Sequence, residues 1–230
     1  MYELDFHNHF ELGVNFFTED YEYVAGATNS SVPLSLKVDK ILYKLIYKYD
    51  NLDYSYQYVS GFKSILNFQF VTSENDLNPN FVIGWNDFLY LKRLGKKGNW
   101  ANRLRLGLST NNDSPFAPFS VDNNVNIRGV GNVIDRGTGS IVLNSEFRYT
   151  VLEKGWFVLQ GNAFVDSGSW RNPGGELSDF ADSDNIKVYS GLGVRFIHKK
   201  IFNAIFRIDY GVGLSNDSSR GFVFGIGQYF

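Results

Sequence analysis

Apolar and polar residues alternate along most of this chain. In residues 2–16 every even position except Asn8 is apolar or aromatic, whereas the odd positions hold carboxylates, histidines, a glycine and an amide. Successive side chains of a β-strand point to opposite faces, so this alternation is typical of a strand that separates two environments. The segment therefore predicts a strand with one apolar, aromatic face and one charged face.

The same alternation recurs to the end of the chain and predicts about ten strands. We expect them over residues 2–16, 41–49, 62–70, 80–92, 102–109, 141–151, 157–167, 188–196, 202–214 and 221–230. Only in 80–92 is the facing ambiguous, because apolar residues occupy both parities. The connectors differ in length: short ones are expected at 94–99, 153–155 and 198–200, and long ones at 18–31, 73–79, 111–138, 169–185 and 215–220. If the strands run up and down, all the long connectors fall at one rim.

Alternation alone fits two kinds of fold, because it does not reveal which face points inward. A soluble sandwich or lipocalin-like barrel buries the apolar face, and a membrane barrel exposes it to lipid. Three features favour the membrane: glycines and arginines recur on the polar face, aromatic residues gather near strand ends, and many strands are long enough to cross a bilayer at a tilt. We predict an all-β fold, a transmembrane antiparallel up-and-down β-barrel of about ten strands, with about eight or twelve as alternatives. Residues 1–230 would form it as a single domain, with long extracellular loops.

Composition narrows the function classes. The 230 residues include no cysteine, which excludes disulfides and thiolate chemistry, and the net charge of −2 gives no reason to expect nucleic acid as a partner. Aromatic residues make up 17% of the chain, which suits a barrel with aromatic girdles. No apolar run is long enough for a transmembrane helix. Residues 1–6 lack the pattern of a signal peptide, so the numbering of an exported protein would begin after a removed segment.

Candidate chemistry on the polar faces is sparse. His7 and His9 share a face with carboxylates, a pattern that can hold a metal, but a polar ladder facing a wet lumen explains them equally well. No serine–histidine–carboxylate set is convincing, since His198 lies in an expected turn. We therefore predict no enzymatic activity, no metal and no cofactor. Together with the inward carboxylates Glu146, Asp166 and Asp209, a set of arginines on polar faces is interpreted as a structural charge network, with anion selectivity as the alternative: Arg103, Arg105, Arg148, Arg195 and Arg207.

Four short motifs occur in one order along residues 50–230. They are Tyr49–Asp53 followed by Ser60–Phe62, then Asn126-Ile127-Arg128-Gly129, then Phe164-Val165-Asp166-Ser167-Gly168, and finally Gly225-Ile226-Gly227-Gln228-Tyr229-Phe230. Together they resemble the outer-membrane assembly-factor superfamily, which contains the BamA and TamA barrels, two-partner-secretion transporters and patatin-like autotransporter barrels. In that family they correspond to a periplasmic turn, a loop signature, a strand signature with an inward aspartate, and a terminal aromatic signal for insertion.

The resemblance implies a role for each motif. The loop carrying Ile127, Arg128 and Gly129 would fold from 111–138 into the lumen, and Arg128 would pair with inward carboxylates of the next two strands, Glu146 and Asp166. Strand parity supports this independently, because both carboxylates lie on polar faces. A guanidinium offers carboxylates a planar fork of donors. Phe164, Asp166 and Gly168 would form the strand motif. The insertion signal would consist of Phe224, Ile226, Tyr229 and Phe230.

The resemblance also implies a function in the bacterial outer membrane. We expect a short barrel that aids outer-membrane protein or lipid biogenesis or export, in contact with outer-membrane lipid and with protein clients. Because the family barrel usually has sixteen strands and POTRA modules ahead of it, the chain would be a short, self-contained member or a fragment. A small barrel of this kind could also form a homodimer. The alternative is a passive pore or structural barrel.

Overall fold

The computed structural model describes residues 2–3, 5–24, 34–76, 79–111, 117–122, 126–131, 135–201, 204–215 and 218–230. Nearly all of its regular structure is β, and a single 3₁₀ turn, η1 (Leu177–Ala181), follows β10. The strands are β1 (Tyr2–Glu3), β2 (Asn8–Glu22), β3 (Ser35–Ser55), β4 (Tyr58–Ser73), β5 (Phe81–Leu94), β6 (Gly98–Ser109), β7 (Phe119–Val121), β8 (Asp135–Gly137), β9 (Gly139–Lys154), β10 (Phe157–Arg171), β11 (Lys187–His198), β12 (Ile205–Gly213) and β13 (Arg220–Ile226). No helix in this described part of the chain is long and apolar enough to cross a membrane.

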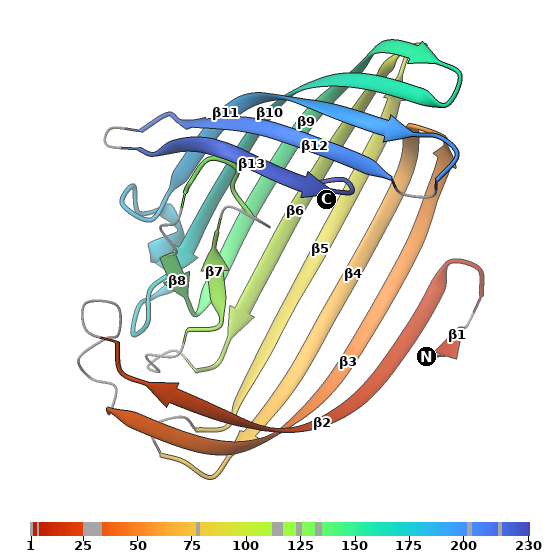
Figure 1. Cartoon of the computed structure of the whole chain (residues 1–230). Coiled ribbons are helices and arrows are strands. Elements are labelled where there is room, and N and C mark those ends of the chain that lie inside the picture. The colour runs from red at the N-terminus through yellow and green to blue at the C-terminus, as the bar shows by residue number, and fades with distance from the viewer. Residues whose placement is uncertain are drawn as a thin grey trace.

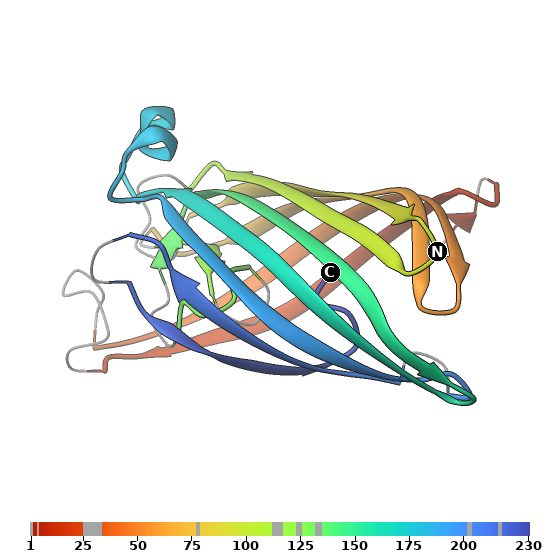
Figure 2. The same ribbon diagram turned by 90° about the horizontal axis from the view of Figure 1, so that it is seen from above.

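One antiparallel sheet holds all the long strands. Its order follows the chain from β1 to β6 and from β9 to β13, and β7 pairs with β8 in a separate small sheet. The large sheet curls into a deep trough (Figure 1), and β7 and β8 lie between its two walls (Figure 2). Every neighbouring pair is antiparallel, so the expected up-and-down meander is confirmed.

The sheet is not closed into a barrel within the described residues, contrary to the prediction. β13 pairs only with β12, and β2 pairs with β3 and with the two-residue β1. β13 also ends earlier than predicted. Pairing stops at Ile226, and Gly227 has a φ of +89°, a left-handed conformation that turns the chain out of the strand. The predicted strand 221–230 is therefore too long by four residues.

Each of the ten predicted segments contains a strand, but several boundaries differ. Segment 2–16 is interrupted because Asp5 accepts hydrogen bonds from the backbone nitrogens of His7 (2.7 Å) and Asn8 (2.8 Å) and so bends the chain before β2. Residues 49–53, expected in a turn, lie within β3, and the turn comes later, at Tyr56 with a φ of +54°. Most strands also extend beyond their predicted ends. Alternation marks the paired centre of a strand better than its ends.

Most charged and amide side chains face the inside of the trough, and the outward face is apolar. β9 shows this most clearly: Asn144, Glu146 and Arg148 are buried, whereas Phe147 and Tyr149 are exposed. The same parity leaves large apolar side chains exposed along the other long strands, among them Leu12, Phe68, Leu108, Val165, Leu192, Phe206 and Phe224. A soluble sandwich or lipocalin-like barrel would have the opposite polarity. The concave side of the sheet is therefore its more polar side.

Long and short connections lie at opposite ends of the sheet, as predicted. Residues 23–34, 74–80, 110–138, 172–186 and 214–219 connect strand pairs at one end. The tight connections between β3 and β4, β5 and β6, and β9 and β10 lie at the other, together with the turn before β12. The longest connection, between β6 and β9, carries β7 and β8 and turns back into the trough (Figure 1). This connection brings Arg128 into the interior.

Candidate functional site

The inserted connection is anchored by apolar contacts before any charge is considered. Ile127 and Val130 are almost fully buried and pack in one cluster with Trp170 of β10 and Tyr189 of β11. The carbonyl oxygens of Gly129 and Val130 accept hydrogen bonds from the Ser219 hydroxyl at 3.1 and 2.8 Å. The segment around Arg128 therefore lies against the inner wall, inside the sheet.

Gly129 makes this close approach sterically feasible. Its φ of +95° is a conformation that favours glycine, and a Cβ at this position would lie 2.6 Å from the backbone carbon of Gly211. Conversely, a Cβ on Gly211 would lie 2.2 Å from the carbonyl oxygen of Arg128. Loop and strand backbones touch only because both residues lack a side chain. The glycine of the loop motif is thus explained by geometry, and its partner on β12 carried no motif.

The structure brings Arg128 together with both carboxylates expected from the sequence. Asp166 accepts from Arg128 Nε at 2.8 Å, from Nη2 at 3.0 Å and from the backbone nitrogen at 3.0 Å, and Glu146 accepts from Nη1. Asp209 of β12 adds a third carboxylate, with its Oδ2 at 3.6 Å from Nη1. All four side chains are completely buried. The two-pronged contact with Asp166 fixes the guanidinium plane.

Further arginines converge on the same carboxylates. Glu146 also accepts from Arg148 and from Arg195 Nη2, and Asp209 accepts from Arg207 Nη1 at 3.3 Å. Arg103 reaches the group through Asn144, whose amide also donates to Asp166 at 2.8 Å. We call Arg103, Arg128, Arg148, Arg195 and Arg207 the arginine cluster. Buried charges are tolerated only when they are paired and hydrogen-bonded, so these contacts depend on one another.

Aromatic rings enclose the Arg128 guanidinium. Its Cζ lies 3.6 Å from the ring centroid of Phe164 and 4.4 Å from that of Tyr229, both within cation–π range. Gly168, the last residue of the strand motif, is buried in β10 opposite Val142 of β9. Phe164 and Asp166 lie two residues apart on β10 and both point inward. They therefore contact the same guanidinium, Phe164 through its ring and Asp166 through its carboxylate.

The four residues of the expected insertion signal divide between two environments. Phe224 and Ile226 project outward from β13 and are largely exposed. After the turn at Gly227, Tyr229 is buried beside Arg128, and the Phe230 ring lies 5.5 Å from Arg103 and 5.9 Å from Arg148. The continued alternation of the sequence gave no sign of this inward turn. A role of these residues in insertion stays a prediction.

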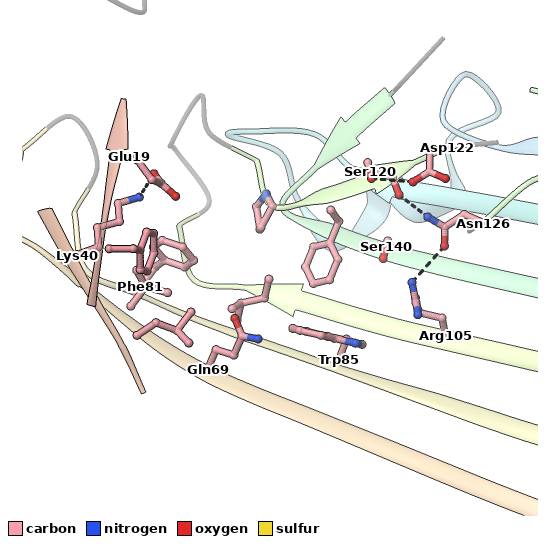
Figure 3. Close-up of a pocket in the computed structure, with 16 residues that line it drawn as sticks. Glu19, Lys40, Gln69, Phe81, Trp85, Arg105, Ser120, Asp122, Asn126 and Ser140 are labelled. Atoms are coloured by element: carbon pink, nitrogen blue, oxygen red, sulfur yellow. Dashed lines mark hydrogen bonds and ion pairs between the residues drawn. The ribbon is translucent and has the colours of Figure 1, made fainter. Parts of the chain in front are cut away.

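A cavity of about 490 Å³ lies between the loop end of the trough and the inserted connection (Figure 3). Its walls combine the rings of Phe17, Phe81, Trp85 and Phe119 with the Lys40–Glu19 ion pair. Arg105 also lines it, held by Asp87 through two hydrogen bonds of 2.7 Å and reaching Asn126 at 3.4 Å. Lys40 and Arg105 on this wall are thus each paired with a carboxylate. Sequence reasoning missed this apolar inner patch because it expected a uniformly polar lumen.

Of the two histidines considered as metal ligands, His7 contacts the backbone of β3. His7 Nδ1 lies 2.9 Å from the carbonyl oxygen of Asp50. Within the described ranges, no three histidine, aspartate or glutamate side chains are grouped closely enough to hold a metal ion.

Neither a scan against models of known protein families nor a search of curated proteins finds a match to this chain. The resemblance to the assembly-factor superfamily therefore stays a prediction from the ordered sequence motifs.

Proposed function

We propose that this chain is a short outer-membrane β-barrel protein of the assembly-factor superfamily that aids the insertion or export of outer-membrane components. The observation that carries the proposal is the inserted connection: Arg128 reaches Glu146 and Asp166 inside a sheet whose apolar face is outward. The resemblance implies this combination, and it would be unusual in a soluble β-protein, where buried ions are rarely gathered on the concave face of a sheet.

The outward apolar face supports a location in lipid. Each long strand exposes leucine, valine or aromatic side chains at alternate positions. In water such a surface would be an extended hydrophobic patch, and in a bilayer it is solvated by acyl chains. The long strands, of nine residues or more apart from β13, are sufficient to span a tilted crossing. These features support the proposed location in a bacterial outer membrane.

The two sheet edges support an assembly role. β2 and β13 present unpaired backbone donors and acceptors over most of their length in the described chain. Such edges are templates for an added strand. In the proposed mechanism, a client strand pairs at this seam while the Arg128 connection braces the interior. A second copy of the chain could occupy the same edges, so a homodimer is a competing occupant.

Reconstitution in lipid vesicles tests the proposal. We expect the purified protein to accelerate the folding of a urea-unfolded outer-membrane barrel added from outside, measured by heat-modifiable migration. Arg128→Ala is expected to lose most of this acceleration, whereas the exposed Arg93→Ala variant keeps it. Folding of the client at the rate seen with protein-free vesicles would contradict the proposal.

Conductance measurements distinguish the proposed assembly role from the alternative of a passive pore. The inserted connection fills part of the trough, so the proposed protein is expected to give no steady channels in a planar bilayer. Ohmic, long-lived conductance, unchanged by Arg128→Ala, would favour the pore.

A further inference from the structure

A second cavity lies at the turn end of the trough, away from the inserted connection. It has a volume of about 420 Å³ and is lined on one side by apolar inward residues of β3, β4 and β5, among them Leu52, Ile65 and Leu89. Arg103, Arg148 and the ring of Phe230 also line it. Its two other charged residues, Lys63 and Asp87, are paired with Asp50 and Arg105. Cavities of roughly 300–1,000 Å³ are typical of small-ligand sites. An apolar wall facing guanidinium groups suits a molecule with two chemically different ends.

The arginine cluster carries more positive than negative charge. Four of its arginines, Arg128, Arg148, Arg195 and Arg207, form ion pairs with only three buried carboxylates, Glu146, Asp166 and Asp209. Elsewhere on the inner wall, lysines such as Lys44 and Lys63 are each paired with one carboxylate, Lys63 with Asp50 at 2.5 Å. Uncompensated charge in a poorly solvated interior is unfavourable. An anion in this region would therefore be stabilised by the protein.

One guanidinium nitrogen beside the cavity is unused. Arg148 donates to Glu146 through Nε, but its buried Nη2 has no hydrogen-bond partner among the described residues. Nη1 of Arg195 and Nε of Arg207 also lack a hydrogen bond, but neither residue lines the cavity. Buried donors of this kind are rare in folded proteins and call for a partner. Arg148 is thus the place where an anion would complete a hydrogen bond.

We propose that this cavity binds a single-chain acidic lipid, with one carboxylate or phosphate head and one alkyl chain. The head would lie between Arg103 and Arg148, because a guanidinium matches the planar oxygens of carboxylate and phosphate. The chain would run along the apolar wall formed by Leu52, Ile65 and Leu89. This site goes beyond the proposed assembly function and does not depend on it.

Binding of dodecanoate and dodecyl phosphate to the full chain in amphipol tests the site, with dodecanol as the neutral probe of equal chain length. We expect both anions to displace a dansylated fatty acid and dodecanol to bind at least about tenfold more weakly, since a charge-assisted hydrogen bond is worth about that factor. Tighter dodecanoate indicates a fatty acid as the natural ligand, and tighter dodecyl phosphate indicates a lysophospholipid. Equal binding of dodecanol, or no binding of either anion, would overturn the proposal.

Matched variants locate the site. Arg148→Gln is expected to weaken anion binding about tenfold, and Arg148→Lys to restore part of it. Arg195→Gln is the control, because it loses a bond to the same Glu146 but lies outside the cavity. On the apolar wall, Leu89→Asn is expected to weaken binding, and Leu42→Asn, which lines the other cavity, to leave it unchanged. If Arg148→Gln fails to fold, the binding measurements with Leu89→Asn and with dodecanol still test the proposed site. Equal effects of Arg148→Gln and Arg195→Gln would contradict the assignment.

Discussion

Across β2–β6 the inward charges pair one strand with the next, whereas across β9–β12 they converge on a residue from the β6–β9 connection. In the first region Lys44 lies 2.8 Å from Glu11, and both side chains keep about a third of their exposure to solvent (27% and 37%). In the second region Arg128, Glu146 and Asp166 have no exposed side-chain surface. The difference arises from the inserted connection, which removes water from one half of the trough.

Burial changes what each ion pair contributes. A partly exposed pair gains little over its hydrated partners, whereas breaking a buried pair leaves a charge that nothing solvates. Ion pairs between the same residue types are therefore expected to contribute very differently to the stability of the two regions. Mutations of equal chemistry should therefore separate the regions.

The largest effect is expected for Glu146→Ala. Three arginines, Arg128, Arg148 and Arg195, donate to this carboxylate, so its removal leaves buried positive charge without a partner. The free energy of unfolding is expected to fall by about 3–5 kcal/mol. The urea midpoint of unfolding in lipid vesicles measures this loss. A loss no larger than that of an exposed pair would mean that water enters this half of the trough.

The next effect concerns the coupling of Arg128 and Asp166. Each single alanine variant should destabilise strongly, and the double variant should lose less than the sum, by about 0.5–3 kcal/mol. The physical reason is that the second substitution removes a charge already left unpaired by the first. A double-mutant cycle on urea midpoints measures this difference. Strict additivity would show that the two groups do not interact.

A smaller loss of unfolding free energy is expected for Gly129→Ala, about 1–3 kcal/mol. The substitution combines a left-handed φ with a clash against Gly211. Gly155→Ala is the matched control, because Gly155 also has a positive φ (+56°) but open space around its Cβ position. Protease cleavage within residues 111–138 should rise in Gly129→Ala alone. Equal behaviour of both variants would leave only the φ preference to explain the loop glycine.

The smallest effect is expected for Lys44→Met in the exposed region, about 0.2–1 kcal/mol. Because the Lys44–Glu11 pair is partly solvated, salt should screen it. The difference in urea midpoint between the variant and the parent should shrink as ionic strength rises. For Glu146→Ala the difference should hardly change with salt, so the pair of measurements tests the contrast directly.

Much of this contrast could be predicted from the sequence, because the alternation of apolar and polar residues shows which side chains share one face of a strand. The parity of Glu146 and Asp166 placed both carboxylates inward, and the loop motif pointed to Arg128 as their partner. Asp209 was recognised as inward but not as a partner of Arg128, since parity gives a face and not a position along it. The contact between Gly129 and Gly211 was also beyond reach, because it depends on how far the connection descends into the trough.

Other features were hidden for definite reasons. Residues 80–92 looked ambiguous because β5 carries Ile83, Trp85 and Leu91 inward and Phe88 and Tyr90 outward, so both faces are apolar. The inward turn at Gly227 was masked by aromatic residues that continue the alternation. Closure of the sheet cannot be read from alternation at all, because period two specifies the two faces of a strand and not its neighbours.

The pairing of β6 with β9 also has a consequence for how the chain folds. All other long neighbours are joined by much shorter connections, whereas these two are separated by 110–138. Closing that loop carries a larger entropic penalty than forming the local hairpins on either side. We therefore expect two hairpin arrays, β2–β6 and β9–β13, to form first and to join late, with docking of Arg128 as the contact that commits them to one sheet.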